Sequence, residues 1–217
     1  QGVEYLLSGQ YENGGWPQFW PGPRGYQVHI TFNDDAIVNT LNMIRDMMNH
    51  KAPYEDDLID KALCVRLGKA FNKGIECILA TQIIKDGEPS VWCQQNDRET
   101  LKPAPARAYE LPSYCSAESA GIVRLLMELP APDARVKRAV HGAMKWFDRY
   151  KLTGLKCERI VLANGERDTR LVEDPQAKPI WARYYDLKYC EPYVCDRDGL
   201  PRRHLEEIGT ERRNGYS

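Results

Sequence analysis

Residues 29–39 read His29-Ile30-Thr31-Phe32-Asn33-Asp34-Asp35-Ala36-Ile37-Val38-Asn39, and this stretch is the most informative part of the chain. A short β-branched and aromatic run ends at two adjacent carboxylates. Beyond them, apolar residues recur at helical spacing, namely Ile37, Val38, Leu41, Ile44, Met47 and Met48. The pattern predicts a helix over residues 34–49 with Asn33 or Asp34 as its N-cap and acidic residues in its first turn. A well-capped helix is one interpretation, and a functional carboxylate pair is the other.

An aromatic loop precedes this helix. Residues 14–22 contain Trp16, Phe19 and Trp20 in a segment too rich in glycine and proline to form a helix or a central strand. Tyrosine and tryptophan suit carbohydrate because each has a flat apolar face and a polar edge. The loop therefore predicts a cleft for a polar ligand, and a sugar is the first candidate.

Composition limits the classes of function. The 217 residues are 42% hydrophobic and 28% charged, which is typical of one globular domain over residues 1–217. A net charge of −1 argues against a nucleic-acid surface, and no apolar run approaches the length of a membrane span. None of the seven cysteines has Cys-x-x-Cys spacing, although Cys190 and Cys195 could close a small loop in an oxidising compartment.

Helical segments repeat along the chain. Residues 2–10 recur as residues 74–82, with a weaker third copy at 142–147, and each of the first two copies precedes a loop that carries a tryptophan. These repeats predict a mainly α fold, an α/α toroid of helical hairpins, with short β-ribbons over the cleft at residues 89–94, 156–161 and 180–186. The first residues resemble a helix interior without a signal sequence, so we expect a fragment that is incomplete at its N-terminus.

Two arginines stand apart from the charged surface pattern. Arg107 and Arg183 each lie in a mainly uncharged run, which suits a bidentate grip on a carboxylate, with a structural salt bridge as the alternative. The four histidines lack zinc-ligand spacing, and no Gly-x-Ser-x-Gly motif is present.

Five colinear blocks within residues 1–205 resemble the pectate lyases of polysaccharide lyase family ten: residues 14–19 (GGWPQF), 30–36 (ITFNDDA), 92–95 (WCQQ) with Asp97, 106–113 (ARAYELPS) and 179–186 (PIWARYYD). The resemblance implies an α/α toroid of three hairpins and calcium-dependent β-elimination of α-1,4-polygalacturonate, which gives unsaturated oligogalacturonides. It also implies a polysaccharide partner, with neither nucleic acid nor membrane, and a secreted or periplasmic protein that we expect to be a monomer. The family's catalytic module has a further acidic segment upstream, and this chain starts after that point.

The resemblance also assigns roles to residues. It implies that Arg183 is the base at C5 of galacturonate, that Arg107 acts beside it and holds substrate, and that Asp34 and Asp35 bind Ca²⁺. The substrate-binding residues expected from the same blocks and loops are Trp16, Trp20, Asn33, Trp92, Lys102, Tyr184 and Arg197. A guanidinium is a poor base, so nearby cations such as Lys102 or Arg107 would have to lower its pKa, and activity should rise with pH.

Two other functions fit the same features. A non-catalytic toroid could use Arg107 and Arg183 only to bind acidic polysaccharide. A glycoside hydrolase on the same scaffold would pair Asp34 with Asp97 or Asp186. The hydrolase would leave saturated chain ends, whereas the binding protein would cleave nothing.

Overall fold

The structure is a computed structural model that describes residues 2–55 and 59–214. The helices are α1 (Gly2–Ser8), α2 (Ala36–Met48), α3 (Lys61–Thr81), α4 (Ser116–Met127), α5 (Ala134–Arg149) and α6 (Thr210–Asn214), with short 3-10 turns at Gly25–Val28, Asn33–Asp35 and Leu205–Glu207. The strands are β1 (Ile30–Thr31), β2 (Ile84–Lys85), β3 (Glu88–Pro89), β4 (Gln95–Asn96), β5 (Ser113–Cys115), β6 (Leu155–Val161), β7 (Arg167–Glu173), β8 (Tyr184–Asp186), β9 (Pro192–Cys195) and β10 (Pro201–Arg202).

Four long helices make the core. Helix α2 packs against α3 and α4, and α5 packs against the same two helices. The apolar stripe predicted for α2 is confirmed, because Ile37, Leu41 and Ile44 are buried against this bundle. Full burial of one such side chain contributes about 1.5–3 kcal/mol relative to its exposure. Asp60 and Asp133 cap α3 and α5 by accepting hydrogen bonds from backbone N–H groups of the first turn.

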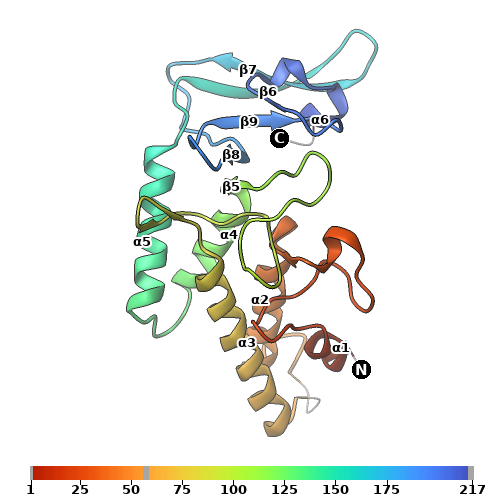
Figure 1. Cartoon of the computed structure of the whole chain (residues 1–217), viewed down its shortest axis with the longest axis vertical. Helices are drawn as coiled ribbons and strands as arrows, with labels where there is room; N and C mark the ends of the chain where they lie inside the picture. The colour runs from red at the N-terminus through yellow and green to blue at the C-terminus, as the bar shows by residue number, and fades with distance from the viewer. Residues whose placement is uncertain (1, 56–58, 215–217) are drawn as a thin grey trace.

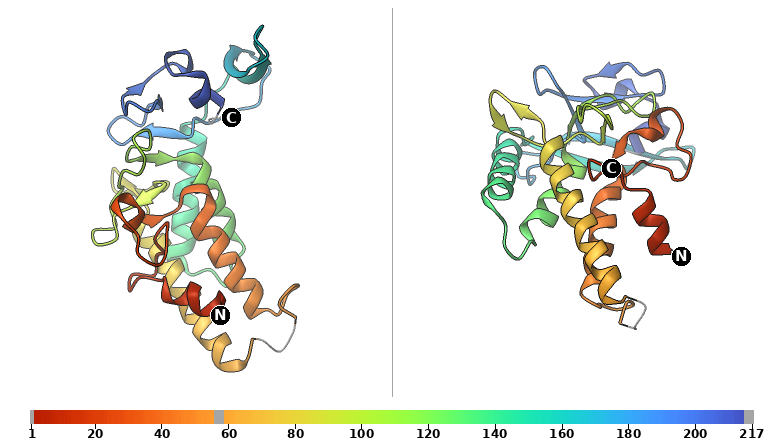
Figure 2. Two further views of the ribbon diagram at one scale, coloured as in Figure 1. Left: turned by 90° about the vertical axis from the view of Figure 1, so that its right-hand side faces the viewer. Right: turned by 60° about the horizontal axis from the view of Figure 1, so that its bottom comes forward.

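Strands β6–β9 gather at one end of the molecule. Figure 1 shows β6–β9 and α6 above the helices, and the side view in Figure 2 shows the same separation. Strands β6 and β7 form a hairpin in continuous antiparallel register from Leu155 opposite Glu173 to Val161 opposite Arg167. The four-stranded sheet has the order β10-β9-β8-β5. Its β5–β8 pair sets the start of α4 beside residue 183, since the N–H of Ser116 donates to the carbonyl of Arg183 at 2.9 Å.

The prediction of an α/α toroid is wrong. The structure is 40% helical and 18% strand, with several small sheets, and it does not close into a ring of hairpins. The third copy of the helical repeat, residues 142–147, lies inside α5 and pairs with α4, so it does not start another hairpin. After α5 the chain continues as β6–β10, whose β-branched and alternating residues favour strands.

One of the three strand predictions is confirmed, and the other two hold only at one end of the segment. The strand expected over residues 156–161 is confirmed as β6. Only the ends of the segments predicted at 89–94 and 180–186 are strands, in β3 and β8. Cys190 is a free thiol in the structure, so Cys190 and Cys195 do not close the small loop that the sequence allowed. Within the described residues, no helix has both the length and the apolar character needed to cross a membrane.

Candidate active site

The Asp34–Asp35 turn is the most strained part of the site. Strand β1 pairs with β4, and the N–H groups of Phe32 and Asn33 both donate to the carbonyl of Gln94 at 2.9 Å, which fixes the entry to the turn. Asp34 (φ 53°, ψ 36°) and Asp35 (φ 57°, ψ 24°) are then consecutive left-handed residues. A non-glycine residue there costs about 1–3 kcal/mol, and such strain concentrates at functional sites.

The N-cap prediction for α2 is therefore wrong. The N-cap is Asp35, and its side chain caps no backbone N–H group. The left-handed turn directs the two carboxylates away from the N-terminus of α2. Asp34 is exposed, whereas Asp35 is half-buried, and its Oδ1 atom has no hydrogen-bond partner among the described residues. Burial, and then the neighbouring charge of Glu118, raise the pKa of Asp35.

Arg183 lies against this turn. Its Nη2 atom donates to Asn33 Oδ1 at 2.7 Å and to Glu118 Oε1 at 2.5 Å, and it lies 3.8 Å from Asp34 Oδ1. The Arg183 side chain is 22% exposed and that of Glu118 is 3% exposed. Burial opposes the charge on Arg183, but Glu118 and its hydrogen bond outweigh this, so the pKa of Arg183 is raised above its ordinary value.

Arg107 forms a second, parallel ion pair. Its Nε atom and its backbone N–H donate to Glu110 Oε2 at 2.8 and 3.0 Å, and its Nη2 atom contacts Oε1 of the same carboxylate. Glu110 is buried, which by itself raises its pKa, but the bonds from Arg107 outweigh burial and hold the pKa of Glu110 below its ordinary value. The same partner raises the pKa of Arg107.

Asn33 connects the two ion pairs. Its Oδ1 atom accepts from Arg183, and its Nδ2 atom donates to Glu110 Oε1 at 3.3 Å and to Asp34 Oδ2 at 3.4 Å. One buried amide thus joins both arginines and the acidic turn into one network. Each arginine is balanced by a buried glutamate, and Asp34 and Asp35 remain as the carboxylates available to a cation.

The structure brings Arg107, Arg183, Asn33 and Asp34 into one network through Asn33 and Glu110, and Asp35 follows Asp34 in the same turn. Arg197 lies near them, because its guanidinium carbon is 6.0 Å from the Tyr109 ring centroid and that of Arg107 is 5.0 Å from the same ring. Arg197 also pairs with Glu211 at 2.5 Å on the surface.

Three aromatic candidates lie inside the protein. Trp92 has no exposed surface and donates from Nε1 to the carbonyl of Ile78 at 2.7 Å, and Trp16 donates to the carbonyl of Leu6 at 3.0 Å. Tyr184 is buried and stacks on Tyr193 with ring centroids 5.8 Å apart. Trp16 nevertheless lines a cavity, whereas Trp92 lies wholly within the core.

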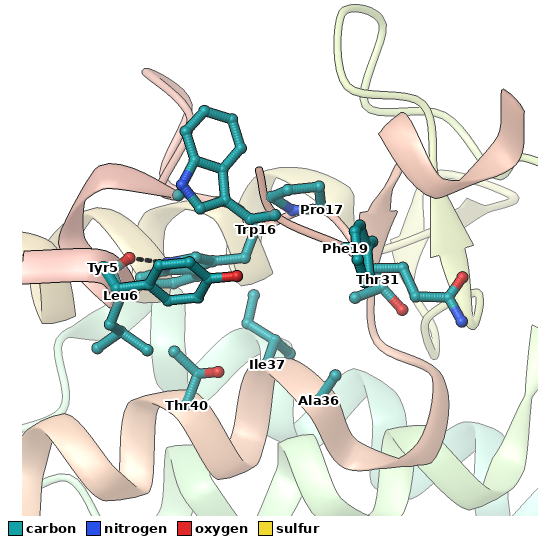
Figure 3. A pocket seen from close by; sticks show the side chains of 12 residues that line it. Tyr5, Leu6, Trp16, Pro17, Phe19, Thr31, Ala36, Ile37 and Thr40 are labelled. Carbon is teal, nitrogen blue, oxygen red and sulfur yellow. Dashed lines mark hydrogen bonds between the residues drawn. The ribbon is translucent and has the colours of Figure 1, made fainter. Parts of the chain in front are cut away.

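Trp20 and Lys102 keep accessible surface. Trp20 donates from Nε1 to Ser8 Oγ at 3.1 Å and lines a cavity of about 310 Å³, which Figure 3 shows between the aromatic loop and the start of α2. Tyr5 and Phe19 line the same cavity, and none of its lining residues is charged. It therefore differs in chemistry from the network of Arg183.

Two carboxylates of this network were not among the predicted site residues. Glu110 stands three residues after Arg107, a spacing that could have predicted the ion pair, and Glu118 lies in the acidic first turn of α4. The Cys115 thiol contacts the second oxygen of Glu118. The pairing of Glu118 with a residue 65 positions away leaves no local signal in the sequence.

A hard cation fits the acidic turn in part. Calcium takes about six to eight oxygen ligands, and Asp34 and Asp35 offer carboxylate oxygens, one of them buried and unpartnered. Among residues 2–55 and 59–214, no three His, Cys, Asp or Glu side chains group as a complete metal site. Further oxygens would therefore have to come from outside this set.

The sequence model described as pectic acid lyase matches residues 1–217. The chain belongs to this family. Two solved structures of a family 10 polysaccharide lyase from Cellvibrio cellulosa each share 33% identity with it and superpose with a TM-score of 0.88 over 99% of its length. One of them is an aspartate-to-alanine mutant in complex with trigalacturonic acid.

The chain spans 66% and 65% of the length of those two structures. No curated protein sequence matches it. The expected assignment to polysaccharide lyase family ten is thus confirmed.

Proposed function

We propose that this member of the pectic acid lyase family cleaves α-1,4-polygalacturonate by β-elimination and releases unsaturated oligogalacturonides. The observation that carries the proposal is the network in which Asn33 joins Arg183 and Arg107 to the Asp34–Asp35 turn. Two cations and a carboxylate pair suit a polyanion whose own carboxylates must be bound and neutralised. The trigalacturonic acid bound to the structural neighbour supports the same class of ligand.

In the proposed reaction, the neutral form of Arg183 removes the proton from C5 of the sugar and becomes a guanidinium cation. The C4–O4 bond then breaks, a C4–C5 double bond forms, and the departing oxygen takes a proton from solvent. Arg107 binds a substrate carboxylate with the guanidinium surface that Glu110 leaves exposed. Because negative charge builds on the uronate as the C5 proton leaves, the fixed cation of Arg107 stabilises the transition state more than the ground state.

Calcium is the proposed cofactor, held by Asp34 and Asp35 together with substrate oxygens. When bound, it would offset the substrate carboxylate and make the C5 proton more acidic. The fit rests on the unpartnered Oδ1 of Asp35, which is a ligand type that calcium prefers.

The surroundings of Arg183 disfavour the neutral form that a base requires. Glu118 raises the pKa of Arg183, so the guanidinium is protonated at neutral pH. The proposal therefore requires activity to increase toward alkaline pH, and a maximum below pH 7 would contradict it.

The remaining predicted residues divide by accessibility. Trp20, Lys102 and Arg197 retain exposed surface, and we propose that they bind the polymer outside the reacting sugar. The other substrate-binding candidates are buried and are proposed to support the site from within, namely Trp16, Asn33, Trp92 and Tyr184. Because the substrate is a cell-wall polymer, we expect the whole protein to be secreted or periplasmic and to act as a monomer.

The hydrolase alternative is weaker. Asp97 accepts hydrogen bonds from the backbone of Glu99 and Thr100, and Asp186 accepts from the backbone of Lys188, Tyr189 and Glu191. Both candidate partners of Asp34 are thus employed as turn caps.

The proposal is tested by ultraviolet absorbance during incubation with de-esterified polygalacturonate, first with calcium and then with excess chelator. A calcium-dependent rise from conjugated unsaturated uronide is expected. New reducing ends without that absorbance would indicate a hydrolase, and substrate binding without cleavage would indicate a binding protein.

A further inference from the structure

Gly121 occupies an unusual place in α4. Glycine is a poorer helix former than alanine, so helix propensity gives no reason for a glycine inside Ser116–Met127. A Cβ atom at this position would lie 2.3 Å from Asp35 Oδ1, 3.1 Å from Asp35 Cγ and 3.6 Å from Asp35 Oδ2. These are its three nearest heavy atoms, and all belong to one side chain. The space left by the missing side chain is therefore filled by the Asp35 carboxylate.

Asp35 is held in that space at a cost. Its backbone is left-handed, its Oδ1 atom is buried, and this oxygen has no hydrogen-bond partner in the part of the chain that the structure describes. Glu118 lies one turn earlier on the same helix and is also buried. A buried carboxylate oxygen without a partner is unfavourable unless a cation compensates it. The arrangement is understandable if the position of the carboxylate serves ligand binding.

We propose that Gly121 is a positioning residue whose missing side chain admits the Asp35 carboxylate to the calcium site. The calcium itself rests on the proposed function, whereas the contact between Gly121 and Asp35 is a feature of the fold. With alanine at 121, the short Asp35 side chain must turn away from α4, because helix backbone cannot yield as easily as a rotating carboxylate.

The test compares Gly121→Ala with Gly68→Ala in the full 217-residue chain. Gly68 is also inside a long helix, α3, but a Cβ there would meet only Met48 Cε at an ordinary 3.5 Å. Because substrate oxygens complete the proposed site, calcium affinity is measured by titration calorimetry with calcium chloride in the presence of saturating trigalacturonic acid, and turnover is measured over a calcium series. We expect Gly121→Ala to weaken calcium binding roughly 10- to 100-fold, as loss of a supporting residue does at metal sites.

The half-saturating calcium concentration for turnover should rise in step, with little change in kcat at saturating calcium. Gly68→Ala should leave the calcium affinity unchanged and keep or raise Tm. Parent-like calcium affinity in a folded Gly121→Ala protein would overturn the proposal. If the parent binds calcium but forms no unsaturated product, the proposed function fails while calorimetry still tests Gly121.

A double variant separates positioning from general packing. If Gly121 acts only through Asp35, then Asp35→Ala/Gly121→Ala has the same calcium affinity as Asp35→Ala alone. A further loss in the double variant would show that the glycine serves packing instead. Should Gly121→Ala fail to fold, recovery of folding in the double variant supports the proposal, and failure of both overturns it. A parent protein that binds no calcium also overturns it.

Discussion

Replacing Glu118 by glutamine removes the charge that holds Arg183 and keeps the shape of the side chain. The two residues are joined at 2.5 Å, and the Glu118 side chain is only 3% exposed. The matched control is Glu128→Gln at the C-terminal end of the same helix. The Glu128 side chain is 56% exposed and pairs with Arg45 at 2.7 Å.

Burial decides the size of each effect. A hydrogen bond to a charged group contributes about 1.5–3 kcal/mol when it is shielded from water. An exposed ion pair contributes about 0.2–1 kcal/mol, because solvent screens it and both side chains lose entropy. We therefore expect the free energy of unfolding to fall by about 1.5–3 kcal/mol in Glu118→Gln and by less than about 1 kcal/mol in Glu128→Gln.

Urea denaturation at pH 7 measures both values. Equal losses in the two variants would refute the conclusion that Glu118 makes the dominant contact of Arg183. The pH profile of turnover gives a second readout. Because Glu118 raises the pKa of Arg183, its removal lowers that pKa and should move the alkaline rise in activity to lower pH. An unshifted rise would separate Glu118 from the proposed base.

Three further predictions follow from the same geometry. Because the pKa of Asp35 is raised, protons should compete with calcium for this carboxylate at pH values above the ordinary aspartate pKa of about 3.9. As the pH is lowered, the calcium affinity measured by calorimetry should therefore begin to fall before that value is reached; constant affinity down to about pH 4 would contradict this. The pKa of Glu110 is lowered in the folded protein, so its ion pair with Arg107 adds to the free energy of unfolding above the unfolded glutamate pKa of about 4.3, and this contribution is lost as pH falls through the folded pKa. Arg107→Ala should therefore lower the free energy of unfolding by roughly 2 kcal/mol at pH 7 in urea denaturation, and by less in acid; an equal loss at pH 3 would count against this reasoning. Trp92→Ala should lower the free energy of unfolding by about 3–5 kcal/mol, whereas Trp20→Ala should cost far less stability and weaken polygalacturonate binding, and the reverse order would exclude the assigned positions.

Local periodicity predicted those elements whose own residues show a clear helical or strand pattern. The apolar spacing from Ile37 to Met48 is sufficient to define α2, because a helix packed on one side needs little else. The short strand-like segment predicted at residues 156–161 lies within β6. The prediction of a toroid is wrong because it assigned residues 142–147 to a further hairpin. In the structure these residues belong to α5, which packs beside α4.

The sequence predicted which types of residue the candidate site contains, but not the contacts between them. Adjacent carboxylates, isolated arginines and the five blocks of family resemblance singled out Asp34, Asp35, Arg107 and Arg183 as candidates, and the structure places them close together. The left-handed turn could not be read from the sequence, because a helix N-terminus rich in aspartate normally predicts capping. The role of Glu118 depends on contacts across the fold.

Burial also changed the meaning of the aromatic residues. Trp16 and Trp92 stand in similar loops after similar helices, and both have the composition expected of a sugar platform. Their indole N–H groups instead donate to helix carbonyls inside the core. Only tertiary packing distinguishes them from Trp20, which keeps accessible surface beside the cavity in Figure 3.

The most direct test of the central claim is the ultraviolet absorbance produced from de-esterified polygalacturonate by the parent chain and by Arg183→Ala, both with calcium at alkaline pH. Binding of trigalacturonic acid to each protein, measured by calorimetry, controls for loss of the site. The proposal predicts a steady rise with the parent, no rise with Arg183→Ala and binding retained by both. Near-normal product formation by Arg183→Ala would contradict the assignment of Arg183 as the base.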